Sequence, residues 1–114
     1  MCDFQKLAFS EHGYVVRCTE CSYFQIGFGT TMLTINNEDF NALYNTIMLQ
    51  LNNLSVKEDL FTEETKGICI ATPSACCSFI LTKKELKCFY DILDKADNEI
   101  KALSLLQLFD KSSL

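Results

Sequence analysis

The chain has 114 residues, a length typical of one domain, and its 48% hydrophobic content excludes a disordered chain. The net charge is -5, and no basic run is longer than Lys83-Lys84, whereas a phosphate-binding surface needs clustered cations. A signal-peptide pattern and an apolar run of about 18 residues are both missing from the sequence. We therefore expect a cytoplasmic protein without a nucleic-acid or membrane partner.

The first predicted strands lie in the N-terminal twenty residues. Apolar Phe4, Leu7 and Phe9 indicate an extended arm or short strand, which ends at the turn 11–13. Residues 14–18 are aromatic and β-branched and predict a second strand. Thr19 and Glu20 then turn the chain.

Residues 23–35 predict a β-hairpin. Gly29-Thr30 suits a two-residue type II′ turn, because glycine accepts a positive φ at the first central position. Such a turn places three pairs on one buried face: Phe28 with Thr31, Ile26 with Leu33, and Phe24 with Ile35. The other face then carries Gln25, Gly27, Met32 and Thr34.

An amphipathic helix is predicted after the hairpin. Asn36 is typical of an N-cap, and Glu38 and Asp39 favour the first helical turn. The apolar stripe steps by three and four residues through Phe40, Leu43, Tyr44, Ile47, Leu51 and Leu54. Asn52-Asn53 ends the helix, and residues 55–66 form a polar surface loop.

The same order of elements then recurs. Residues 67–72 and 76–81 predict two strands joined by the turn 73–75, and Thr82 with Glu85 forms a capping box. The stripe of the second helix is Leu86, Phe89, Tyr90, Leu93 and Ile100. This helix runs as far as Phe109 or breaks near Asp97-Asn98.

The two halves align at a separation of 46 residues. Matched positions are Leu33 with Phe79, Ile35 with Leu81, Asp39 with Glu85, Phe40 with Leu86, Leu43 with Phe89, Tyr44 with Tyr90, and Ile47 with Leu93. We expect one α+β domain, residues 1–114, with pseudo-duplicated hairpin–helix units at 13–54 and 67–109. Its fold is an antiparallel sheet of about five strands with both helices on one face.

Seven cysteines are the main candidates for chemistry: Cys2, Cys18, Cys21, Cys69, Cys76, Cys77 and Cys88. Cytosolic thiols stay reduced, so metal binding or burial is favoured over disulfides. Cys18 and Cys21 form a C-x-x-C that fits one edge of a zinc tetrahedron. Cys2 and His12 lie nearby in sequence and could complete a structural zinc site that fastens the N-terminal arm.

Other interpretations of these residues stay open. Cys18 and Cys21 can also be buried or incidental thiols, or a redox pair, although the following segment is strand-like and reactive C-x-x-C pairs sit at a helix N-terminus. Cys69 and Cys88 fit small apolar fillers. Cys76 and Cys77 are adjacent in a strand and point to opposite faces. His12 also fits an exposed turn residue.

No catalytic constellation accompanies the single histidine, and the Gly27-Phe28-Gly29 segment lies in a hairpin rather than before a helix. Tyr44 and Tyr90 fit core or interface positions. The C-terminal run is apolar nearly all round, with Leu103, Leu105, Leu106, Leu108 and Phe109. Such a surface must be covered, either by the chain's own domain or by a partner. Of these two, we expect a homodimer contact through the C-terminal helix.

The stretch Gly13 to Cys21, followed by Phe24-Gln25 and Phe28-Gly29-Thr30, resembles a family of short bacterial proteins of unknown function, typical of Bacteroidetes. Residues 79–93 are similar to that family's C-terminal half. The resemblance implies a bacterial cytosolic protein and carries over no catalytic residues.

The leading hypothesis is a non-enzymatic cytosolic protein-interaction domain in which Cys18 and Cys21 hold a structural zinc ion. The alternative is a thiol-based redox or metal-sensing protein that uses the same pair. An enzyme with a small-molecule substrate has no residue pattern behind it.

Overall fold

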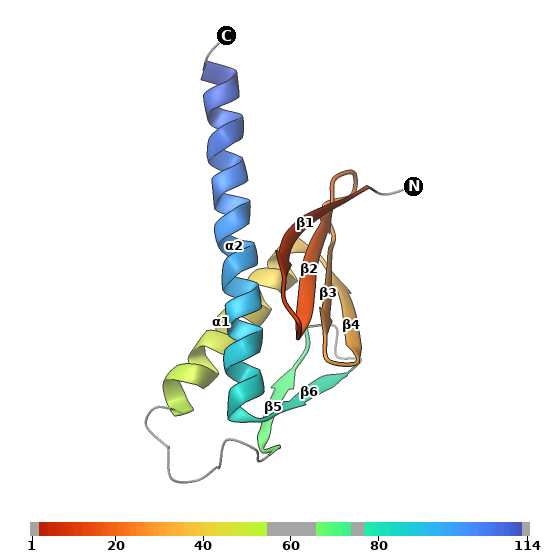
Figure 1. Cartoon of the computed structure of the whole chain (residues 1–114), viewed down its shortest axis with the longest axis vertical. Helices are drawn as coiled ribbons and strands as arrows, with labels where there is room; N and C mark the ends of the chain where they lie inside the picture. Colours follow the sequence, from red (N-terminus) through yellow and green to blue (C-terminus); the bar gives the residue numbers. More distant parts are fainter. Residues whose placement is uncertain (1–2, 55–65, 74–76, 113–114) are drawn as a thin grey trace.

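The computed structural model describes residues 3–54, 66–73 and 77–112. Within these residues the chain forms six strands in two antiparallel sheets and two helices (Figure 1). In chain order the elements are β1 (Phe4–Phe9), β2 (Gly13–Cys18), β3 (Phe24–Phe28), β4 (Thr31–Ile35), α1 (Asn37–Leu54), β5 (Ile68–Ala71), β6 (Ser78–Leu81) and α2 (Lys83–Ser112).

The strands β1 to β4 pair in sequence order, and we call them the main sheet. The β3–β4 hairpin has the predicted register, with Phe28 opposite Thr31 and Ile26 opposite Leu33. Gly29 has a φ of 60°, as a type II′ turn requires. The hairpin's inner face contributes buried side chains to the core: Phe24, Ile26, Phe28, Leu33 and Ile35.

The N-terminal segment is a full strand of the main sheet. Its register with β2 shifts between Lys6 and Ala8, where one strand carries an extra residue. Such a bulge interrupts the regular alternation of side chains between the two faces of the sheet. The consecutive residues Leu7 and Ala8 can therefore both be buried. The predicted arm or short strand is therefore a strand.

Both helices cover the inner face of the main sheet (Figure 1). The ring of Phe40 in α1 stacks on Phe24 with centroids 4.5 Å apart, and the ring of Phe89 in α2 stacks on Phe28 at 4.4 Å. These contacts fix the helices to β3, so the predicted two-layer arrangement is present.

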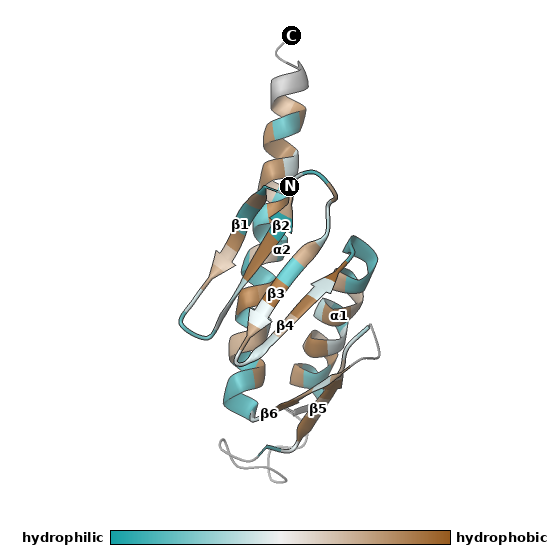
Figure 2. Cartoon of the chain, turned by 90° about the vertical axis from the view of Figure 1, so that its right-hand side faces the viewer, coloured by the Kyte–Doolittle hydropathy of each residue, from teal (hydrophilic) through white to brown (hydrophobic). Residues whose placement is uncertain are grey.

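The second hairpin does not extend the main sheet, which differs from the predicted single sheet of about five strands. Strands β5 and β6 pair only with each other among the described residues. Phe79 of β6 instead packs edge-on against Phe28 and Phe89, with centroids 6.4 and 4.9 Å away. The small hairpin therefore closes one end of the core, and Figure 2 shows its mostly hydrophobic strands below the main sheet.

Both helix starts have the predicted caps. The Asp39 amide donates to Asn36 Oδ1 at 2.8 Å. At α2 the Thr82 amide donates to Glu85 Oε1 at 2.9 Å, and the Glu85 amide donates to Thr82 Oγ1 at 3.0 Å. Helix α2 continues without a break through residues 97–98 and is about 45 Å long at 1.5 Å per residue.

The two hairpin–helix units agree in local order and in burial. Matched core pairs such as Leu33 and Phe79, or Phe40 and Leu86, are buried in both halves. Their strands nevertheless belong to different sheets, so duplication of the unit stays a prediction. Within the described residues, neither helix is sufficiently long and apolar to span a bilayer.

Candidate functional site

The Cys18–Cys21 turn connects β2 to β3 and curls around the Cys18 sulfur. The Cys18 amide donates to the Tyr23 carbonyl at 2.8 Å, and the Ser22 amide donates to the Cys18 carbonyl at 3.0 Å. The Cys21 amide points at Cys18 Sγ, 3.4 Å away. The backbone of the turn thus places an N–H donor against the Cys18 sulfur.

Ser22 adopts a left-handed backbone with a φ of 64°. A non-glycine residue in this region is uncommon and costs about 1–2 kcal/mol. The turn lacks the glycine typical of zinc knuckles, but Ser22 takes the conformation that glycine usually supplies. The backbone is thus bent so that positions 18 and 21 lie on the same turn.

The two cysteines differ in exposure. Cys18 is 2% exposed and lies outside the main core cluster, whereas Cys21 is exposed. Both line a hollow of about 390 Å³ on the outer face of the main sheet, the face away from the helices. The rest of its lining consists of Phe4, Tyr23, Phe24, Gln25 and Thr34. One sulfur is therefore sheltered and the other meets solvent.

The start of β1 is attached to this turn. The Asp3 carbonyl accepts hydrogen bonds from the Thr19 amide at 2.9 Å and the Thr19 hydroxyl at 3.2 Å. Phe4 pairs with Cys18 across the strands. Cys2, the third predicted ligand, lies outside the described residues, one position before Asp3.

The structure does not bring His12 to the turn. Its carbonyl accepts from the Gly29 amide at 3.1 Å, at the end of β2 opposite Cys18. Six residues of strand separate the two positions by roughly 20 Å. Of the three predicted ligands within the described residues, Cys18 and Cys21 are brought together and His12 is not. No group of three or more potential ligands is assembled within the residues described.

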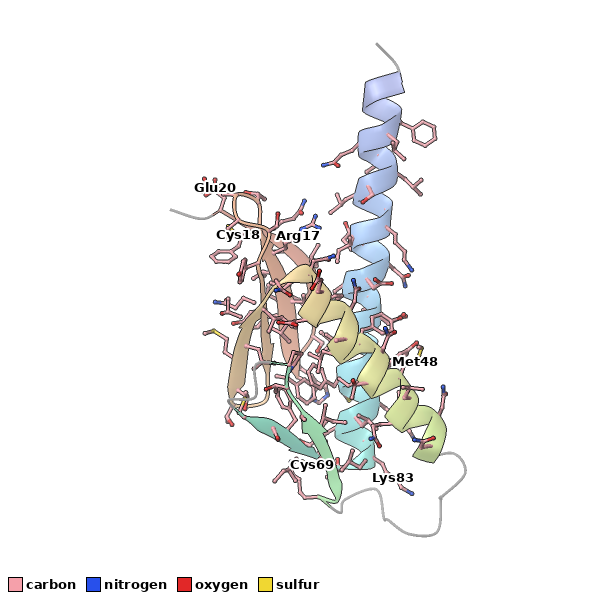
Figure 3. All side chains as sticks on the ribbon, turned by 180° about the vertical axis from the view of Figure 1, so that it is seen from behind. Arg17, Cys18, Glu20, Met48, Cys69 and Lys83 are labelled. Atoms are coloured by element: carbon pink, nitrogen blue, oxygen red, sulfur yellow. The ribbon has the colours of Figure 1, made fainter. Side chains whose placement is uncertain are left out.

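The remaining cysteines lie elsewhere. The prediction that Cys69 is a buried filler is wrong, because β5 turns Ile68 and Ile70 inward and Cys69 is exposed. Figure 3 shows Cys69 at the end of the molecule opposite Cys18. Cys88 is half-buried against the core, as predicted. Cys77 is exposed, and Cys76 lies outside the described residues.

Tyr44 and Asp94 join the two helices, a contact that the sequence patterns did not reveal. The Tyr44 hydroxyl donates to Asp94 Oδ1, which together with burial raises the pKa of Tyr44 above its ordinary value. Tyr90 packs edge-on against Tyr44 with centroids 5.8 Å apart. The two tyrosines are thus partly buried at the helix interface. The sequence offered one signal for this contact: Asp94 lies four residues after Tyr90, so the two side chains share one face of α2.

The C-terminal end of α2 projects beyond the main sheet and α1 (Figure 1). Ile100 and Leu103 still pack partly against the core. Beyond them the large apolar side chains are mostly exposed: Leu105 at 57%, Leu106 at 60%, Leu108 at 63% and Phe109 at 69%. This part of the predicted apolar run is left uncovered by the described part of the chain.

Four of these positions form a stripe of their own. Ala102, Leu105, Leu106 and Phe109 are spaced i, i+3, i+4 and i+7, so they share one helix face, which we call the end stripe. Leu105 follows core residue Ala96 by nine residues, which is two and a half turns. The end stripe therefore faces away from the domain's own core.

Fold and site together define a two-layer α+β domain with a paired-cysteine turn and a projecting apolar helix end. The chain belongs to a family of unknown function, DUF6686, whose model matches residues 1–112. Neither a curated protein nor a solved structure matches the chain significantly.

Proposed function

We propose that this protein is a protein-association domain that forms a homodimer through the end stripe of α2. The observation that carries the proposal is the exposure of Leu105, Leu106 and Phe109 on a helix that projects from its own domain. Exposed apolar surface of this kind marks association sites, and homodimers are the commonest assemblies.

The mass of the protein in solution tests the dimer. Leu105→Glu and Leu106→Glu place a charge in the proposed contact, so we expect both variants to be monomeric in light scattering and sedimentation. Leu49→Glu is a matched control, because Leu49 is 59% exposed on α1, away from the end stripe. Dimers of unchanged mass in both α2 variants, or a monomeric wild type, would contradict the proposal.

We further propose that the Cys18–Cys21 turn holds a structural zinc ion in this domain. The amide directed at Cys18 Sγ and the left-handed Ser22 support a turn that presents two sulfurs to one ion. Cys2 is the third proposed ligand, because Asp3 is hydrogen-bonded to Thr19 of the same turn. Zinc bound there would tie β1 to the β2–β3 connection and add to folding free energy.

Metal analysis of protein purified without chelator tests the zinc site. We expect zinc in proportion to the chain, lost in Cys18→Ser and Cys21→Ser and retained in Cys69→Ser, the control at the far end of the molecule. Cobalt substitution should give thiolate-to-metal charge-transfer absorption. Metal-free wild-type protein would contradict the site.

The alternative function is thiol-based redox or metal sensing by the same pair. The exposure of Cys21 beside a sheltered Cys18 favours it. The turn precedes a strand, however, so the pair lacks the helix N-terminus that lowers thiol pKa in thioredoxin-like proteins. Metal-free protein with one fast-reacting thiol would support this alternative, whereas bound zinc that resists peroxide would support the structural site.

A further inference from the structure

Three features of the end stripe bear on how two copies meet: its spacing, the unequal size of its side chains and the charge beside it. The stripe begins with a small residue, Ala102, and ends with a large one, Phe109. Leu105 and Leu106 lie between them. All four side chains are exposed.

We infer that the two α2 helices pair antiparallel, with the two-fold axis between Leu105 and Leu106. This inference rests on the proposed homodimer. A two-fold contact is reciprocal, so each residue must fit the position that faces it. In this register Ala102 faces the partner's Phe109, and Leu105 faces the partner's Leu106. Small therefore meets large at both ends of the contact.

A parallel pair fits the same stripe poorly. Each residue would face its own copy, so two Phe109 rings would hold the helices apart while two Ala102 methyl groups left a gap. Helix pairs approach to 8–10 Å according to the side chains between them, and unfilled space at a contact loses packing energy. The antiparallel register keeps the distance between the two helices even along the stripe, and packing therefore favours it.

The charge beside the stripe is compatible with the same direction. Lys101 flanks the end stripe; its ammonium pairs with Asp97 Oδ2 at 2.9 Å, and its side chain is 71% exposed. In the antiparallel register it lies beside the last turn of the partner's α2, where helix carbonyls carry partial negative charge. The two domain bodies then sit at opposite ends of the pair and do not compete for space.

The size of the contact predicts its strength. About two helical turns from each copy cover less than the roughly 1,200 Å² of a stable interface. We therefore expect a dimer that dissociates on dilution, so its dissociation constant can be measured by sedimentation for each variant.

A size swap tests the register in the full chain. Phe109→Ala should weaken the dimer about tenfold or more, and Ala102→Phe should weaken it by crowding. The double variant restores a small-to-large match only if positions 102 and 109 face each other. We expect its dissociation constant to return to within about twofold of wild type.

The possible outcomes separate the inference from the proposed function. The two single variants each raise the dissociation constant by some factor. If the double variant raises it by the product of these factors or more, the antiparallel register is wrong although the dimer stands. A wild type that is monomeric removes both. Far-UV circular dichroism that is unchanged in each variant confirms that the substitutions at these exposed positions leave the fold intact.

Discussion

Single residues control how closely the strands of the main sheet approach. Gly27 lies under the ring of Tyr14, and a Cβ built on Gly27 would come within 2.3 Å of that ring. A Cβ built on Gly13 would instead come within 2.2 Å of the Gly27 carbonyl oxygen. Both positions require glycine, but one clash is with a side chain and the other with backbone.

This difference predicts a mutational cycle. Gly27→Ala should destabilise the protein by about 1–3 kcal/mol, because the Tyr14 ring, hydrogen-bonded to Gln25 at 3.2 Å, must move. A Tyr14→Ala background should remove much of that cost, whereas it should not relieve Gly13→Ala. Urea unfolding of the wild type, the three single variants and the two double variants measures the cycle. Equal relief of both glycine variants would contradict the structure.

At the scale of the element, α2 starts from a network centred on Glu85. Its carboxylate accepts from the Thr82 amide and from Lys66 Nζ, 2.5 Å away. Lys66 and then the Thr82 backbone lower the pKa of Glu85 below its ordinary value near 4.5. The unfolded chain therefore binds this proton more readily than the folded one.

The shift gives a pH dependence with a definite sign. Stabilisation by Glu85 is present above pH 4.5 and is lost as the pH falls below that value through the lowered pKa of the folded state. In urea unfolding, Glu85→Gln should be less stable than wild type at pH 7, and the gap should close in acid. A gap that widens below pH 4.5 would show that the carboxylate does not stabilise the cap.

For the whole molecule, the projecting end of α2 sets the long axis of 57 Å. The core closes around residues up to Ile100 and Leu103, so the last turns contribute little to the stability of a single copy. In the proposed dimer, association and folding would therefore depend on different parts of α2.

Removal of residues 104–114 separates these two roles. We expect the shortened chain to stay folded and monomeric, with a free energy of unfolding within about 0.5 kcal/mol of the wild-type monomer. Sedimentation and urea unfolding at low protein concentration measure both quantities. A dimer that survives the deletion would place the interface elsewhere, and an unfolded chain would show that the end of α2 supports the core.

Local chemistry was sufficient to predict the β3–β4 register, the Asn36 and Thr82 caps and the inward face of each helix. These features depend on neighbours within a few residues, such as the Gly29 turn and the period of the apolar stripe. The apolar excess at the end of α2 was also visible in the sequence, but the sequence did not decide whether the chain's own domain covers it.

Tertiary structure decided what depends on contacts between distant segments. The separate β5–β6 sheet arises because Phe79 packs against Phe28 and Phe89 at the end of the core instead of lying beside another strand. His12 is close to Cys18 in sequence but lies at the other end of a rigid strand. The sequence by itself thus determined the elements and their buried faces, whereas sheet membership and the grouping of ligands required the assembled core.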